Sequence, residues 1–208
     1  MWIGPENQMT LVLIRHGATK SNKEHRYLGR MEESLITDGV KELIRYKSLS
    51  RYPDVDYLFN SPMKRCRESS FILYPNRPSF LIPEWEEMNF GEFEGKNCIE
   101  LNEDVRYQTW IDSNGTLPFP EGESREEFIK RCERGFHRMG KLLLEVVDQD
   151  KGEPKSVGII AHGGTIMALL YRYYGGDYFD YQVTNGGGYE CTLKRGSHEP
   201  KITDIKKI

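Results

Sequence analysis

Runs of consecutive apolar residues alternate along this chain with segments whose apolar residues recur every three or four positions. Residues 10–15 (TLVLIR) and 156–161 (SVGIIA) are β-branched and aliphatic runs, each followed by a glycine two positions later. Such runs are typical of strands that are buried on both faces of a sheet. Shorter runs at residues 57–60 and 79–82, and weaker ones at 189–193 and 202–205, predict four further strands.

Four segments have the spacing of helices. The first covers residues 38–50, and the second begins with Ser61-Pro62, an N-cap followed by a proline at the first helical position, and continues to about residue 74. The third begins with the capping box of Ser124 and Glu127, and the fourth follows Gly164. The first, third and fourth of these segments have an apolar stripe. The stripes are, in that order, Val40, Leu43 and Ile44; Phe128, Cys132, Phe136, Met139, Leu143 and Val146; and Ile166, Leu169, Leu170 and Tyr173.

This alternation of strands and helices predicts an α/β fold, a three-layer α/β/α sandwich around a mostly parallel central sheet. The two weak C-terminal strands are candidates for antiparallel edges. With 208 residues, the chain has the length of one domain covering residues 1–208. Periodicity fails over residues 83–122, where prolines, glycines and aromatic residues are scattered, so we expect a lid or substrate-shaping insert there.

Composition narrows the class of partner. Hydrophobic residues make up 38% and charged residues 29% of a chain with a formal net charge of -3, which provides no global attraction to nucleic acid or to an anionic membrane. The predicted partner is therefore a small molecule. The four cysteines form no CxxC pair, which favours reduced thiols. No signal-peptide pattern or long apolar segment is present, so a cytoplasmic location is expected, with residues before Met9 forming a loose extension.

The two strongest strands both end in His-Gly, as LVLIRHG at His16 and as VGIIAHGG at His162. In open α/β sheets, ligands bind at the carboxyl edge of the strands, so both histidines are expected to face one crevice. Gly17 and Gly163 allow close approach of the backbone, and a helix starting near Gly164 offers amide donors to an anion.

Three further polar residues suit the same crevice. Arg65 falls in the first turn of a predicted helix that also starts at a strand's end. Together with Arg15, it forms a candidate clamp for a tetrahedral oxyanion, to which Asn22 adds a neutral donor. The sequence therefore predicts a local cationic pocket for a phosphate.

Short motifs occurring in the same order connect the chain to a known family. They are Arg15-His16-Gly17-Ala18-Thr19 with Asn22, Ser61-Pro62-Met63-Lys64-Arg65, Glu87-Met88-Asn89-Phe90-Gly91, Glu94-Gly95 and Ala161-His162-Gly163. From about residue 10 to 166 the chain resembles the histidine phosphatase superfamily, which also contains the cofactor-dependent phosphoglycerate mutases. Its length and its PFPEGES segment look most like the small alpha-ribazole phosphatases of cobalamin biosynthesis and broad-specificity relatives.

The resemblance implies a phosphomonoesterase that works through a phosphohistidine on His16, without metal or cofactor. Arg15, Arg65 and His162 would hold the phosphate, assisted by Gly17, Asn22 and the Gly163 amide. Nearby cations favour the neutral, nucleophilic form of the imidazole and stabilise charge on the transferred group.

The leaving alkoxide requires a proton, for which Glu84, Glu86 and Glu87 are the candidates. Glu87 is preferred because Glu87-Met88-Asn89-Phe90-Gly91 aligns with the family's acid motif. The aromatic residues of the insert are interpreted first as packing residues, some of which contact an organic phosphomonoester.

Several alternatives follow from the same residues. Cys132 to Arg138 has the Cys-x5-Arg spacing of cysteine-dependent phosphatases, but Cys132 lies on a helical apolar stripe, so a core position is predicted. The histidines lack the spacing of a metal site. A phosphoglycerate mutase is the first rival function, disfavoured by Leu28, where mutase-like members often carry a hydroxyl residue. A non-catalytic phosphate-ligand binding module is the second. Oligomeric state is not predicted.

Overall fold

A six-stranded sheet forms the centre of the computed structural model, which describes residues 8–150 and 154–208. The strands are β1 (Gln8–Arg15), β2 (Tyr57–Asn60), β3 (Ser79–Leu81), β4 (Ser156–Ala161), β5 (Gly188–Lys194) and β6 (Lys201–Lys207). Their order across the sheet is β3-β2-β4-β1-β5-β6. The first four are parallel, whereas β5 is antiparallel to both β1 and β6.

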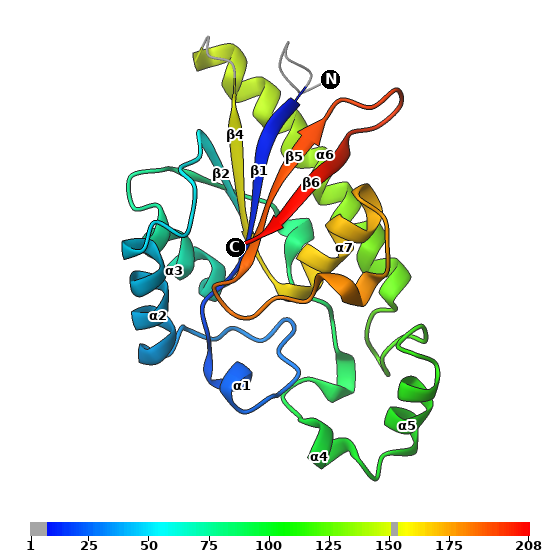
Figure 1. Cartoon of the computed structure of the whole chain (residues 1–208). Helices are drawn as coiled ribbons and strands as arrows, with labels where there is room; N and C mark the ends of the chain where they lie inside the picture. Colours follow the sequence, from blue (N-terminus) through cyan, green and yellow to red (C-terminus); the bar gives the residue numbers. More distant parts are fainter. Residues whose placement is uncertain (1–7, 151–153) are drawn as a thin grey trace.

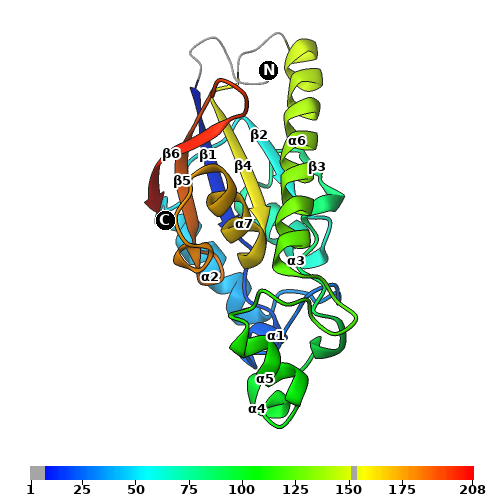
Figure 2. The same ribbon diagram turned by 90° about the vertical axis from the view of Figure 1, so that its right-hand side faces the viewer.

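Helices cover both faces of this sheet, so the predicted three-layer α/β/α arrangement with a mostly parallel sheet is confirmed (Figures 1 and 2). On one face lie α2 (Thr37–Ser48) and α3 (Lys64–Leu73), and on the other α6 (Arg125–Asp150) and α7 (Gly163–Tyr173). The strands alternate their side chains between two apolar cores: Leu11 and Leu13 face α6 and α7, while Val12 and Ile14 face α2 and α3.

The predicted apolar stripe of α6 is buried from Phe128 to Leu143, whereas its last member, Val146, is half-buried. Phe128, Cys132, Phe136, Met139 and Leu143 have no exposed surface. At the start of the helix, Ser124 Oγ accepts a hydrogen bond from the amide of Glu127, whose carboxylate accepts one from the Ser124 amide, so the capping box is confirmed.

Three expectations need correction, and one element was not predicted. The helix after β2 begins at Lys64 with Met63 as N-cap, not at Ser61-Pro62, and the Ser61 hydroxyl contacts His162 at 2.8 Å as well as accepting from the Met63 amide at 3.4 Å. β5 lies inside the sheet, since β6 covers its outer edge. The first strand already includes Gln8; the rest of the predicted N-terminal extension lies outside the described residues. The short helix α1 (Lys20–Lys23), capped by Thr19, was not predicted.

The predicted insert is partly helical and lies beyond the carboxyl ends of the parallel strands. It contains the 3-10 turns η1 (Pro83–Trp85) and η2 (Gly91–Phe93) and the short helices α4 (Cys98–Leu101) and α5 (Val105–Asp112). Figures 1 and 2 show α1, α4 and α5 below the sheet. A last 3-10 turn, η3 (Tyr178–Tyr181), follows α7. In the described part of the chain, no helix combines the length and apolarity of a membrane span.

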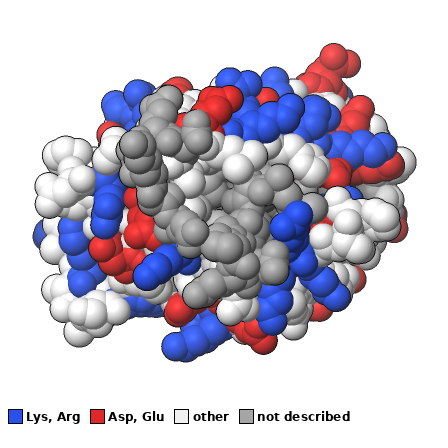
Figure 3. All heavy atoms as spheres, turned by 90° about the horizontal axis from the view of Figure 1, so that it is seen from above, with Lys and Arg blue, Asp and Glu red and all other residues white. Residues whose placement is uncertain are grey.

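Charge is evenly mixed at the opposite end of the molecule. Figure 3 looks onto the amino ends of the central strands, where Lys and Arg are interspersed with Asp and Glu around atoms that are not described. This face therefore shows no extended field of one sign, which agrees with a net charge of -3.

Candidate active site

The two histidines predicted to converge are neighbours. Because β1 and β4 pair in parallel with Arg15 opposite Ala161, His16 and His162 leave the sheet at the same edge. The His16 amide donates to the Ala161 carbonyl at 3.0 Å, and the ring centroids of His16 and His162 are 5.2 Å apart. Both side chains are buried, with exposures of 3% and 0%. The two histidines predicted from the strand ends therefore lie together at the carboxyl edge of the sheet.

The hydrogen bonding of His16 determines which ring nitrogen can attack an electrophile. Nδ1 lies 2.7 Å from the Gly17 carbonyl oxygen, which can only accept. Nδ1 therefore carries the proton, and the lone pair of the neutral ring is on Nε2. Burial, followed by the charges of Arg65 and Arg15, holds the pKa of His16 well below its ordinary value. At neutral pH the imidazole is uncharged and nucleophilic.

His162 uses both of its ring nitrogens within the protein. Arg65 Nε donates to Nδ1 at 3.3 Å, so Nε2 carries the proton and donates to Ser61 Oγ at 2.8 Å. Burial and the charge of Arg65 lower the pKa of His162 well below its ordinary value. The ring is therefore held as a fixed, neutral neighbour of His16.

The two predicted arginines lie beside this histidine pair. Arg65 is fully buried, and its Nη1 and Nη2 donate to the carbonyls of Met31 and Gly29 at 2.9 and 2.8 Å. Each of these nitrogens keeps a second N–H. Arg15 Nη1 donates to the Val183 carbonyl at 2.7 Å, but its buried Nε has no hydrogen-bond partner among the described residues. A buried N–H without a partner is unfavourable, so an anion bound here would satisfy it.

Of the three candidate acids, only Glu87 is directed toward this centre. Its Oε2 accepts from the Gly164 amide at 3.4 Å and its Oε1 from the Met88 amide at 2.9 Å, which places it at the first turn of α7. Burial raises the pKa of Glu87, although Arg65 and Arg15 oppose the shift. Glu84 instead pairs with Arg138 at 3.5 Å, and Glu86 with Arg30 at 3.9 Å.

The predicted auxiliary groups have different environments. The Gly17 amide already donates to Ser69 Oγ at 3.0 Å. Gly17 therefore contacts the site through its carbonyl, which accepts the hydrogen bond from His16 Nδ1. The Asn22 Oδ1 atom accepts from the Thr19 amide at 3.2 Å, which leaves Nδ2 as its donor toward a ligand. A Cβ at Gly163 would stand 3.6 Å from the Arg15 guanidinium, so the backbone passes close to this arginine.

Sequence reasoning missed the loop before β5. Asn185 Nδ2 donates to the His16 carbonyl at 3.1 Å and to Asn22 Oδ1 at 3.0 Å, and Val183 holds Arg15. Ser61, interpreted as a helix cap, orients His162. An available signal was the Asn-Gly at residues 185–186, since a strand antiparallel to β1 begins at the edge where β1 ends.

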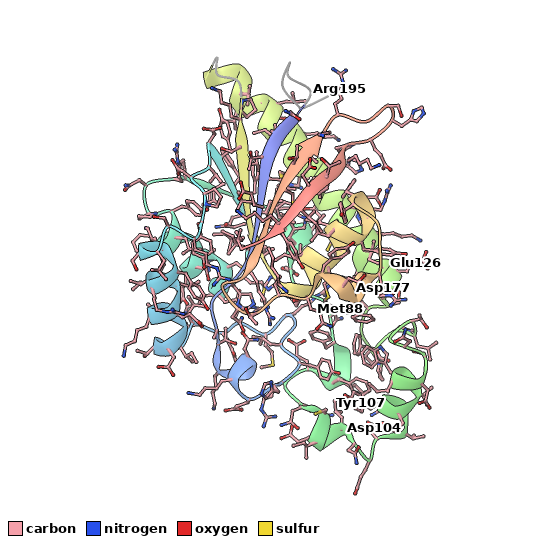
Figure 4. All side chains as sticks on the ribbon, in the orientation of Figure 1. Met88, Asp104, Tyr107, Glu126, Asp177 and Arg195 are labelled. Carbon is pink, nitrogen blue, oxygen red and sulfur yellow. The ribbon has the colours of Figure 1, made fainter. Side chains whose placement is uncertain are left out.

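An aromatic cavity adjoins the carboxyl group of Glu87. It has a volume of about 200 Å³. Its aromatic lining is Tyr27, Phe90, Trp110, Phe119, Tyr178 and Phe179, and its one cationic side chain is that of Arg125. Figure 4 shows Met88, next in sequence to Glu87, between the sheet and Tyr107 of α5. Insert residues thus form part of the wall of the space next to Glu87, and Trp110 Nε1 is buried without a hydrogen-bond partner among the described residues.

The structure describes the surroundings of the cysteines and of the side chains that bind metals elsewhere. Burial raises the pKa of the Cys132 thiol on α6, which disfavours a thiolate nucleophile there. None of the four cysteines forms a disulfide. Among the described residues, no three side chains of His, Cys, Asp or Glu are grouped so that they could bind a metal.

Comparisons with known proteins agree with this geometry. A protein of Hydrogenobacter thermophilus provisionally assigned as a phosphoserine phosphatase is 29% identical over 167 residues, which are 77% of this chain and 76% of the relative. The adenosylcobalamin/alpha-ribazole phosphatase of Salmonella typhimurium is 27% identical over 169 residues, 79% of each chain. A 2,3-bisphosphoglycerate-dependent phosphoglycerate mutase of Bifidobacterium longum is also similar, with 27% identity over 185 residues, 77% of this chain and 75% of the relative.

The solved alpha-ribazole phosphatase of Shigella flexneri has the same fold, with a TM-score of 0.75 and 23% identity over 95% of this chain and 96% of that one. Residues 11–201 match the model of the histidine phosphatase superfamily, branch 1. With its paired strand-end histidines and most of its length matched, the chain belongs to the histidine phosphatase superfamily.

Proposed function

We propose that the protein is a metal-independent phosphomonoesterase that transfers the phosphoryl group of a small organic ester to His16 and then to water. The observation that carries this proposal is the 2.7 Å hydrogen bond from His16 Nδ1 to the Gly17 carbonyl. It leaves the Nε2 lone pair of a buried, neutral imidazole beside two guanidinium groups, as a nucleophile toward a phosphate dianion requires.

In the first step, Nε2 of His16 forms a bond to phosphorus while the bond from phosphorus to the ester oxygen breaks. Glu87, whose pKa is raised by burial, gives its proton to the leaving oxygen. Arg15 and Arg65 stabilise the charge on the non-bridging oxygens with their unused N–H groups, while His162 holds Arg65.

In the second step, the Glu87 carboxylate takes a proton from a water molecule, and the resulting oxygen attacks phosphorus. The bond from phosphorus to Nε2 then breaks, which restores the imidazole and releases inorganic phosphate. Each group returns to its initial protonation state.

The aromatic cavity supports an organic ester with an apolar, planar leaving group. Six aromatic side chains surround the space next to Glu87, and the indole N–H of Trp110 is available as a donor. Alpha-ribazole 5'-phosphate, which carries a benzimidazole, is the first substrate to test, since a similar protein is named an adenosylcobalamin/alpha-ribazole phosphatase. In this proposal the insert at 83–122 shapes the substrate site.

Arg125 supports a second candidate, a substrate whose leaving group carries a carboxylate. This arginine lines the same cavity and lies 5.6 Å from the Tyr178 ring centre, where it could pair with phosphoserine. Comparing kcat/KM for alpha-ribazole 5'-phosphate and phosphoserine in the parent, Trp110→Ala and Arg125→Gln separates the two. A selective loss of the first substrate in Trp110→Ala supports the aromatic ester.

Replacing His16 tests the chemistry itself. His16→Ala should abolish phosphate release from any ester that the parent hydrolyses, whereas His137→Ala, an exposed position on α6 beside Glu133, should retain parental activity. Rapid acid-free quenching of the parent with radiolabelled ester should trap an acid-labile phosphoprotein that His16→Ala lacks. Parental activity in His16→Ala would end the proposal.

Two other functions remain testable against it. A phosphoglycerate mutase would isomerise phosphoglycerate without releasing phosphate. Leu28, which is 6% exposed, disfavours that activity because mutase-like members often carry a hydroxyl residue at this position. A binding module would retain phosphate ligands without turnover. A screen of phosphorylated metabolites that measures both phosphate release and isomerisation distinguishes all three.

A further inference from the structure

The acid candidate Glu87 stands on a segment without regular secondary structure. Residues 86–90 lie between the turns η1 and η2, so their carbonyl groups have no ladder partners. Among the described residues, the Glu87 carboxyl accepts hydrogen bonds from the amides of its neighbour Met88, at 2.9 Å, and of Gly164, at 3.4 Å. Because neither contact anchors the main chain, the position of this carboxyl depends on what holds the segment itself.

One arginine of α6 holds that segment by its carbonyl groups. Arg131 Nη1 donates to the carbonyl oxygens of Glu84 and Glu86, both at 2.8 Å, and Nη2 donates to that of Glu87 at 3.1 Å. Three carbonyls within four consecutive residues are thus bonded to one planar guanidinium. A lysine could not reproduce this fork, because an ammonium lacks its fixed geometry.

Glu123 completes the contact from the other side. Its Oε1 and Oε2 accept from Arg131 Nε and Nη2 at 2.7 and 2.6 Å, and Oε2 also accepts from the Asn89 amide at 2.9 Å. The side chains of Arg131 and Glu123 are only 12% and 15% exposed. The pair therefore holds the main chain on both sides of Glu87, and we refer to it as the Arg131–Glu123 clamp.

A mostly buried ion pair is weak evidence for stability, because desolvation offsets much of the attraction. We propose that the Arg131–Glu123 clamp positions Glu87 for proton transfer to the leaving group, an inference that rests on the proposed phosphatase function. Arg131 and Glu123 are positioning residues, since the hydrogen bonds of their side chains, among the described residues, are to main-chain groups of residues 84–89 and to each other.

Leaving-group dependence separates positioning of the acid from a general structural role. Benzyl phosphate expels a basic alkoxide that needs a proton, whereas 2,4-dinitrophenyl phosphate expels a stable phenolate that does not. A misplaced acid therefore slows only the first ester. Loosening of the whole site slows both.

The experiment measures kcat/KM for both esters in the parent, Arg131→Met and Glu87→Gln, and in the double variant. Arg138→Met is the matched control, because Arg138 lies on the same helix but is 52% exposed, and among the described residues its ion pair is with the Glu84 side chain, at 3.5 Å. Thermal unfolding of each variant checks the fold. If Arg131→Met does not fold, Glu123→Gln, which preserves size, decides the question in the same assay.

The expected result is a loss of about 10–100-fold for benzyl phosphate in Arg131→Met, as for displacement of a catalytic group by about 1 Å. The loss for 2,4-dinitrophenyl phosphate should stay below about threefold, and in the Glu87→Gln background Arg131→Met should add less than about threefold on benzyl phosphate. Equal losses for both esters, or full additivity with Glu87→Gln, would overturn the proposal. Failure of the phosphatase function is distinct, since His16→Ala would then match the parent.

Discussion

Gly164, the second residue of α7, lies against the proposed acid so closely that one methyl group should disable it. A Cβ at this position would stand 2.5 Å from Glu87 Oε1, and 3.1 and 3.2 Å from two ring carbons of Phe128. Phe128 is fully buried in the main core and cannot yield easily. In Gly164→Ala the Glu87 carboxyl therefore has to retreat by about 1 Å to reach an ordinary contact.

The expected size of the effect follows from this displacement. General acid catalysis contributes about 10²–10⁴-fold, and misplacement by about 1 Å removes about 10²-fold of it. The free energy of unfolding changes less than the activation free energy that corresponds to this loss of activity. Alanine in a helix is about 1 kcal/mol better than glycine, whereas overpacking costs about 1–3 kcal/mol. The net destabilisation of about 0–2 kcal/mol corresponds to a Tm decrease of at most about 8 °C.

The assay compares kcat/KM for benzyl phosphate and 2,4-dinitrophenyl phosphate in Gly164→Ala, Glu87→Gln and the parent, with Tm measured for each. Gly164→Ala is expected to lose activity selectively on the benzyl ester, by no more than Glu87→Gln does. A folded Gly164→Ala protein that hydrolyses benzyl phosphate as fast as the parent would refute it, because the carboxyl at residue 87 would then not need its present position.

Three further outcomes are expected. Because burial and the charge of Arg65 hold the pKa of His162 below its ordinary value, the unfolded chain binds a proton that the folded protein does not. Stability therefore falls as pH drops below about 6.5, and His162→Ala should reduce the slope in urea titrations by an amount that grows from pH 7 toward pH 5, where it approaches the one-proton limit of about 1.4 kcal/mol per pH unit. Cys132→Ala should keep parental kcat/KM while losing about 1 kcal/mol of stability by thermal unfolding, since its buried thiol is no nucleophile; an inactive but folded variant would contradict this. Dialysis against EDTA should leave kcat unchanged, and a loss that Mg²⁺ or Zn²⁺ restores would speak against metal-independent chemistry.

The elements that the sequence predicted well are those with long apolar patterns. The 10–15 and 156–161 runs became neighbouring central strands, and the stripe from Phe128 to Leu143 became the buried face of α6. The prediction of these segments is correct because burial of a continuous apolar face decides their conformation. The short helices α1, α4 and α5 were missed, because side-chain caps such as Thr19, Asn97 and Asp104 define them more than apolar periodicity does.

Ser61 shows how tertiary contacts override a local signal. Ser61 followed by Pro62 has the pattern of an N-cap, yet the helix begins three residues after Ser61, at Lys64. Its hydroxyl contacts His162 Nε2 at 2.8 Å, across 101 positions of the chain. A cap preference worth about 1 kcal/mol cannot be weighed against such a contact from the sequence alone.

The sequence by itself determined the alternating α/β order and the placement of His16 and His162 at strand ends, because local apolar periodicity and the parallel sheet require both. Only the tertiary structure decided the His16 tautomer, the buried environment that distinguishes Glu87 from Glu84 and Glu86, and the contacts of Arg131, Asn185 and the aromatic cavity. These depend on hydrogen bonds and burial between residues far apart in the chain. Such contacts form only after the sheet has brought their elements together, so no local pattern records them.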